Sequence, residues 1–115
     1  MLPDDELQQS WLTLETVLAQ QLGKIPVMDD ILIHIGIREA GLPPRQFTET
    51  EKINLIQMAI SAVLVPAGYY ELFWVEDSGW PHYKQLQRVP EMSLPERNKF
   101  LQPFVMMYAK KNKLV

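Results

Sequence analysis

The chain of 115 residues has no cysteine, only two histidines and five isolated glycines. The lack of cysteine excludes a disulfide framework, a thiolate nucleophile and a cysteine-ligated zinc site. His34 and His82 are too few for a zinc site, which takes at least about three protein ligands, and no His-Glu-x-x-His spacing occurs. The glycines form no Gly-rich phosphate-binding loop. We therefore expect neither a metal nor a cofactor.

Long apolar runs and an excess of basic charge are also missing. The longest apolar stretch, Ile53 to Val65, is interrupted by polar residues and is shorter than the roughly 20 residues that cross a bilayer. The start of the chain, Met1 to Glu6, is acidic where a secretory signal would be basic. A formal charge of −3 gives no long-range attraction for nucleic acid or anionic membranes. We expect a cytoplasmic protein that binds neither.

The composition that remains is that of a globular protein. Hydrophobic residues make up 47% of the chain and charged residues 22%. The length fits one domain of ordinary size, and no repeat or long linker interrupts it. We predict a single globular domain over residues 1–115.

Apolar residues recur at helical spacing in four segments. Two of them open on a capping box, Thr48 with Glu51 and Ser93 with Glu96. The predicted helices span about residues 4–22, 29–40, 48–65 and 93–111. Pro103 lies inside the last one, where its ring removes a hydrogen bond while the apolar spacing continues, so we predict a kink.

The third predicted helix is apolar except for one narrow polar stripe, formed by Asn54, Gln57 and Ser61. A helix that is apolar around most of its circumference is normally buried by several neighbours, so we expect this helix to be the most buried element. Gly36, inside the second helix, costs roughly 1 kcal/mol relative to alanine there, which predicts a close contact with a neighbouring element.

Residues 69–83 hold six of the eleven aromatic residues of the chain. The turn sequence Asp77-Ser78-Gly79 lies between two β-prone runs and predicts an antiparallel hairpin. The predicted fold class is therefore mainly α: three helices, a two-stranded antiparallel β-hairpin, and a C-terminal helix kinked at Pro103.

A three-residue loop at 77–79 places Glu76 opposite Trp80, Trp74 opposite His82 and Tyr70 opposite Leu86. Each face of the hairpin then carries large apolar side chains. One predicted face shows Tyr70, Leu72, Trp74, Trp80 and His82, and the other shows Phe73, Val75, Pro81 and Tyr83. One face can pack on the third helix, and the other needs cover from the chain's own helices, a protein partner or a ligand.

No spacing typical of catalysis occurs, so we assign no catalytic residue. The residues that we predict to bind a ligand or partner all lie on the hairpin: Tyr70, Trp74, Asp77, Trp80, His82 and Tyr83. Secondary candidates on the second helix are His34, Arg38 and Glu39, where a histidine oriented by a carboxylate could act as a general base. The alternative, which we favour, is that His34 is a histidine at the edge of a packed helix that is satisfied by one hydrogen bond.

Several short motifs carry a resemblance to a known family. They are Ile35-Gly-Ile-Arg-Glu-Ala-Gly41, Glu51-Lys52, Gly68-Tyr-Tyr-Glu71 and Asp77-Ser-Gly-Trp-Pro-His82. From about residue 28 onward the chain resembles a family of small uncharacterised bacterial proteins. The resemblance implies no activity, ligand or partner.

Three classes of function compete. The first is a protein-interaction or homo-oligomeric assembly module that uses the aromatic hairpin and binds a second copy or another protein. The second is a small-molecule-binding protein or enzyme with a pocket at the hairpin. The third is a winged-helix nucleic-acid binder, which we disfavour because the third helix and the hairpin carry few basic residues.

Overall fold

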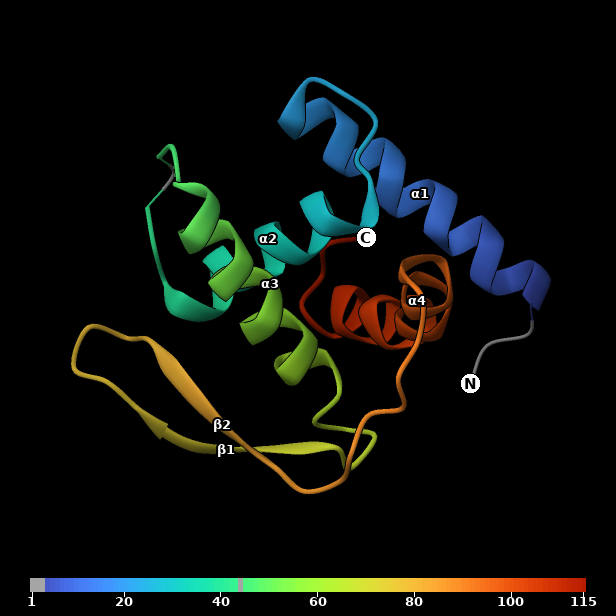
Figure 1. Ribbon diagram of the computed structural model, residues 1–115. Coiled ribbons are helices and arrows are strands. Elements are labelled where there is room, and N and C mark those ends of the chain that lie inside the picture. Colours follow the sequence, from blue (N-terminus) through green and yellow to red (C-terminus); the bar gives the residue numbers. More distant parts are fainter. Residues whose placement is uncertain (1–3, 44) are drawn as a thin grey trace. The chain divides into compact units, whose positions relative to one another are not determined.

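The computed structural model describes residues 4–43 and 45–115, and for residue 4 it describes the backbone alone. Its elements follow the predicted order of three helices, a hairpin and a fourth helix (Figure 1). They are α1 (Asp4–Leu22), α2 (Met28–Ala40), α3 (Glu49–Val63), β1 (Tyr70–Val75), β2 (Pro81–Gln85) and α4 (Leu94–Lys111). The predicted fold class is confirmed. No helix in this part of the chain is long and apolar enough to cross a membrane.

The chain divides into two compact units. The first contains residues 1–28 and 91–115, and the second contains residues 29–90. The single domain that the sequence predicts over residues 1–115 stays a prediction.

In the first unit α1 packs against α4. The buried residues of α1 include Leu14 and Leu18, and those of α4 include Leu101 and Val105. These residues repeat at helical spacing, which is why each helix presents one apolar face. Gly23 has a φ of +75° and ends α1, and its backbone N–H donates to the carbonyl of Ala19 at 2.9 Å.

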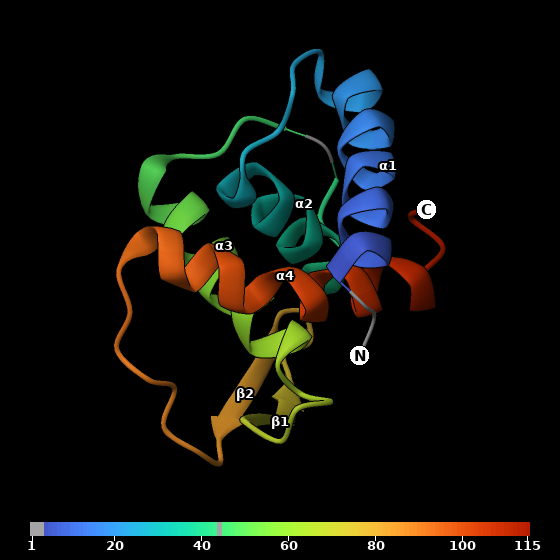
Figure 2. The ribbon, with the colours of Figure 1, turned by 90° about the vertical axis from the view of Figure 1, so that its right-hand side faces the viewer.

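Helix α4 runs without a break through Pro103. Both ribbon views show that the axes of its orange first part and its red last part point in different directions (Figures 1 and 2). A proline in a helix interior bends the helix because its ring clashes with the preceding turn. The helix therefore continues and bends, as predicted. Both predicted capping boxes are present, at Ser93 with Glu96 and at Thr48 with Glu51.

In the second unit α2 and α3 come into backbone contact at Gly36. A Cβ built on Gly36 would lie 2.6 Å from the carbonyl oxygen of Leu55 and 3.0 Å from its Cβ. No side chain fits at that distance from a backbone oxygen. The close contact expected from a glycine inside a helix is therefore confirmed, and its partner is α3.

A cluster of buried residues lies next to this crossing. Its centre is formed by Ala40, Leu55 and Met58, and partly buried side chains pack around it. Those side chains are Ile33, Ile37, Leu42, Phe47, Trp80 and Tyr83. Since Trp80 and Tyr83 come from the hairpin, the cluster joins α2, α3 and the hairpin. The prediction that α3 is the most buried element is wrong. Five residues of α3 are exposed, among them Ile53 at 54%, whereas Arg38 is the one exposed residue of α2. The buried residues of α3 form one face.

The hairpin is antiparallel, and both strands contact α3 (Figure 1). The turn is the predicted one: Gly79 has a φ of +97°, and its N–H donates to the carbonyl of Glu76 at 2.8 Å. Trp74 lies opposite His82, as predicted, whereas Tyr70 lies opposite Gln85 and not Leu86. A bulge between Leu72 and Trp74 causes this shift, because Phe73 is an extra residue without a partner.

The bulge also changes which side chains share a face. Leu72 lies opposite Tyr83, and Val75 lies opposite Pro81, so Leu72 belongs to the face of Tyr83. The prediction that Tyr70 and Leu72 share the face of Trp74 is wrong for this reason. Trp80 precedes β2 and packs with Tyr83 in the buried cluster, although strand alternation predicted it on the opposite face.

The Gly36 contact predicts the effect of adding one methyl group. We expect Gly36→Ala to lower the free energy of unfolding by about 1–3 kcal/mol, because the overpacked backbones must separate. This loss would occur even though alanine favours a helix by roughly 1 kcal/mol over glycine. Urea denaturation measures the change. Gln20→Ala, at an exposed position of α1, is the control and should stay within about 0.5 kcal/mol of the parent. A Gly36→Ala variant as stable as the parent would contradict the close crossing.

Candidate functional site

A groove in the second unit lies between α3 and the start of β2. Its volume is about 350 Å³, in the lower part of the range of roughly 300–1,000 Å³ found for ligand sites. Helix α3 lines it with Asn54, Gln57, Met58 and Ser61, and the hairpin lines it with Trp80, Pro81, His82 and Tyr83. The polar stripe of α3 therefore faces the groove.

The two walls of the groove differ in chemistry. On α3, the side chains of Asn54 and Gln57 are exposed, and the hydroxyl of Ser61 donates to the carbonyl of Gln57 at 3.1 Å. A side-chain amide offers both a donor and an acceptor to a ligand. On the hairpin, Pro81 is buried and Trp80 and Tyr83 reach into the apolar cluster. The groove therefore combines amide groups with an aromatic wall.

His82 is held by two neighbours on the hairpin. Its Nε2 lies 2.5 Å from Oε2 of Glu76, and its ring stacks on that of Trp74 with centroids 4.5 Å apart and 5° between the planes. Because an ionised carboxylate can only accept, this hydrogen bond places a proton on Nε2. The pair is about 40% exposed, so it adds little to stability. Its effect is to fix the orientation of the imidazole at the groove.

Tyr83 is uncharged at neutral pH. Burial, with a smaller effect from the negative charge of Glu39, raises the pKa of Tyr83 to about 12. Its phenol can therefore donate or accept a hydrogen bond but supplies no phenolate base. The effect of Glu39 indicates that the C-terminal part of α2 lies close to the hairpin. The backbone agrees with this, because a Cβ built on Gly79 would lie 3.2 Å from the carbonyl oxygen of Ala40.

The six predicted hairpin residues fall into three groups. Trp80, His82 and Tyr83 line the groove, and Trp74 contacts it through the stacked His82. Tyr70 and Asp77 are not among the lining residues. Asp77 is exposed in the turn, and Tyr70 is half-buried on β1.

The secondary candidates on α2 do not join the groove. Burial, followed by the positive charge of Arg38, lowers the pKa of His34, so this histidine is neutral at physiological pH. Arg38 thus acts on His34 from the next turn, and Glu39 acts on Tyr83. These interactions do not support His34 as a general base that is oriented by Glu39 or by the hairpin. Within the described residues, no group of three or more potential ligands could hold a metal ion.

Sequence reasoning missed the helical wall of the groove and the partner of His82. Asn54, Gln57 and Ser61 were interpreted only as the polar stripe of a buried helix, and Glu76 only as the residue opposite Trp80 beside the turn. The structure places the first three against the hairpin and joins Glu76 to His82. A polar stripe on the helix just before an aromatic hairpin is the signal that could have indicated a groove.

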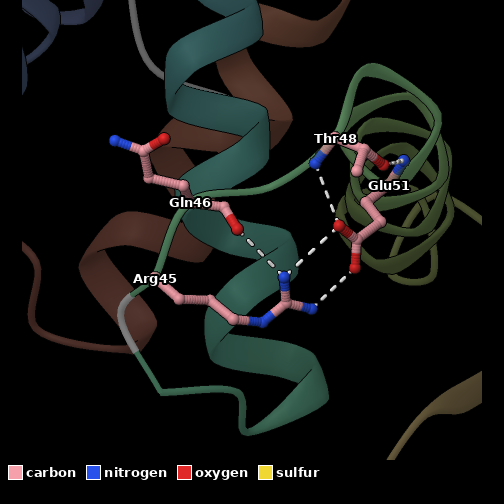
Figure 3. Close-up of polar contacts among 4 residues, drawn as sticks. All are labelled: Arg45, Gln46, Thr48 and Glu51. Atoms are coloured by element: carbon pink, nitrogen blue, oxygen red, sulfur yellow. Dashed lines mark hydrogen bonds and ion pairs between the residues drawn. The ribbon is translucent and has the colours of Figure 1, made fainter.

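A second polar cluster fixes the loop before α3 (Figure 3). Arg45 binds both carboxylate oxygens of Glu51, through Nη2 at 2.6 Å and Nη1 at 3.3 Å, and its guanidinium lies 4.2 Å from the ring centroid of Phe47. The same carboxylate accepts the backbone N–H of Thr48 at 2.9 Å. The capping box therefore also anchors the loop, whose Phe47 packs on the buried cluster. This arrangement is structural.

No family model matches the chain, and no curated protein or solved structure is significantly similar to it. The resemblance noted from the sequence motifs therefore brings no functional residue to the groove. Its function has to be inferred from its own geometry and chemistry.

The Arg45–Glu51 cluster predicts a pH dependence. The hydrogen bonds from Arg45, followed by the backbone hydrogen bond from Thr48, lower the pKa of Glu51 from 4.5 to about 2. A depressed carboxylate pKa contributes stability that is fully present above pH 4.5 and lost as the pH falls toward 2. The difference in melting temperature between the parent and Glu51→Gln should therefore shrink across this window.

Thermal melts followed by circular dichroism at several pH values measure this difference. Glu49→Gln is the matched control, because the Glu49 carboxylate is highly exposed and contacts Lys52 Nζ at 3.4 Å. We expect no comparable change with pH for the control. A Glu51→Gln variant whose difference from the parent is constant from pH 5 to pH 2 would show that the Arg45 contact does not persist in solution.

Proposed function

We propose that this chain is a protein-interaction module that assembles with a second copy of itself through β1. One observation carries the proposal. Four consecutive apolar residues of β1 are at least half exposed: Leu72 at 53%, Phe73 at 68%, Trp74 at 50% and Val75 at 50%. Single exposed apolar residues are ordinary, whereas a contiguous exposed run on one strand marks an interaction surface.

The position of this run strengthens the proposal. The sheet has two strands in the order β1–β2, so within the described chain the outer edge of β1 has no neighbouring strand. Between Tyr70 and Val75 there is no lysine, proline or glycine to block pairing, and the edge-protecting features of the strand are the bulge at Phe73 and the charge of Glu71. An apolar edge of this kind is normally covered by another chain.

A second copy is the partner that fits this strand. A two-fold axis brings the same surface of both copies together, so an apolar strand meets an equally apolar strand. The flanking carboxylates, Glu71 and Glu76, select the register. Antiparallel registers that keep Glu71 away from Glu76 of the other copy avoid the repulsion between these two carboxylates.

The size of the surface predicts a weak dimer. Four side chains at about half exposure offer roughly 300–400 Å² per copy, which is about half of the surface that each partner buries in a stable complex. We therefore expect dissociation on dilution. The structure gives less support to nucleic-acid binding, because Lys52 on α3 pairs with Glu49 and the polar stripe faces the hairpin.

Light scattering during size-exclusion chromatography tests the proposal. At a loading concentration of about 100 μM, suited to a weak interface, the parent should elute as a dimer. Phe73→Thr keeps a strand-forming residue and removes the most exposed ring of β1, so it should be a monomer. Ile25→Thr is the control, because Ile25 is 77% exposed but lies outside the hairpin. A monomeric parent, or a Phe73→Thr variant that remains dimeric, would contradict the proposal.

A further inference from the structure

The groove between α3 and β2 has a strand edge as one wall. The N–H of Glu76 donates to the carbonyl of Trp80 at 2.9 Å, and the N–H of Leu86 donates to the carbonyl of Tyr69 at 2.8 Å. Backbone groups of successive strand residues point to opposite edges. Between these two bonds His82 and Lys84 therefore face β1, whereas Pro81, Tyr83 and Gln85 face away from it.

This outer edge of β2 is suited to accept another strand. No further strand lies beside β2 in the part of the chain that the structure describes. Tyr83 and Gln85 each present an N–H and a carbonyl there, and Pro81 presents a carbonyl alone. Unlike β1, β2 has no extra residue, so its outward groups keep the regular spacing of two residues. Regular spacing is what a pairing strand requires.

The opposite wall can hydrogen-bond a strand from its other side. Asn54, Gln57 and Ser61 recur at intervals of three and four residues, so they form one row along α3. An extended peptide bound to β2 has N–H and carbonyl groups on its far edge too. The amides of Asn54 and Gln57 can serve both kinds of group, since each carries a donor and an acceptor.

The remaining lining residues decide the chemistry of the ligand. Among the residues that the structure describes, no lysine, arginine, aspartate or glutamate lines the groove, and the imidazole of His82 is bound to Glu76. A phosphate or free carboxylate would find no fixed positive charge. Met58, at 6% exposure, and the rings of Trp80 and Tyr83 offer contacts to apolar side chains.

We propose that the groove between α3 and β2 binds an extended peptide segment, which adds to the outer edge of β2 as a third strand. Backbone hydrogen bonds to Tyr83 supply the main contact on one side, and the amides of Asn54 and Gln57 supply it on the other. Alternate side chains of the peptide point toward Met58 and Trp80, so apolar residues are favoured at every second position. This surface and its occupant are separate from the dimer contact at β1.

A displayed library of random linear peptides provides the probe, with the immobilised full-length protein as the target. We expect enrichment of peptides with apolar residues at alternate positions, and the strongest of them is then synthesised for titration calorimetry. Gln57→Leu keeps a side chain of similar size and removes the amide, and should weaken binding about tenfold, as for the loss of one well-formed hydrogen bond. Gln20→Leu, the same change at an exposed position of α1, should bind like the parent.

Backbone methylation of the synthetic peptide distinguishes strand addition from other modes of binding. Methyl groups are placed on each peptide nitrogen in turn. Where the N–H faces β2, methylation should weaken binding about tenfold or more, so the losses should recur at every second residue. Losses without this alternation would overturn the proposal.

Three further outcomes would also overturn it. They are a screen that enriches no peptide, a peptide whose affinity is the same for Gln57→Leu and the parent, and binding confined to non-peptide small molecules. A peptide that binds Phe73→Thr less tightly than Gln57→Leu would place the site at β1. The dimer test uses no peptide, so either proposal can fail while the other stands.

Discussion

The backbone contact between Gly36 on α2 and Leu55 on α3 is the constraint on which the second unit depends. The 2.6 Å between the oxygen of Leu55 and a Cβ built on Gly36 leaves room for hydrogen alone. Because the helices meet backbone to backbone, Ala40, Leu55 and Met58 form a small buried cluster beside the contact. A side chain at position 36 would separate the helices and open that cluster, on which the hairpin depends.

The hairpin is held by the cluster through Trp80 and Tyr83. A two-stranded ribbon is marginal in water by itself, so these two rings and the contact of Gly79 with Ala40 decide where the hairpin lies. The consequence is a sheet with two different edges. The edge of β1 carries a bulge and an exposed apolar run, whereas the edge of β2 is regular and borders a groove with amide groups. Both proposals follow from this asymmetry.

Much of the fold could be predicted because it depends on local chemistry. Capping boxes at Thr48 and Ser93 mark two helix starts, and Asp77-Ser78-Gly79 marks the turn, since each motif satisfies its own backbone groups. The glycine inside α2 correctly indicated a close contact. The sequence could not identify Leu55 as the partner, because that pairing depends on how two helices cross.

The errors of prediction arise from tertiary contacts. Nothing in the sequence around Phe73 indicates a bulge. The predicted register was therefore wrong by one residue on the Tyr70 side of Phe73, and Tyr70 and Leu72 were assigned to the wrong face of the hairpin. The exposure of Ile53 and the position of Trp80 in the cluster depend on packing, which periodicity does not determine. At the candidate site, the aromatic residues were recognised as candidates but the groove was not, because its amide wall comes from a helix that appeared fully explained as core.

Hydrogen exchange of the β2 backbone amides, followed residue by residue by NMR, tests the central claim most directly. The amides of His82 and Lys84 face β1 and should exchange slowly, whereas those of Tyr83 and Gln85 face away from β1, at the outer edge of β2, and should exchange at least about tenfold faster. This alternation would show a formed hairpin with an open outer edge. Equally slow exchange at all four positions would mean that the edge is already covered, and equally fast exchange would mean that the hairpin is not held on α3.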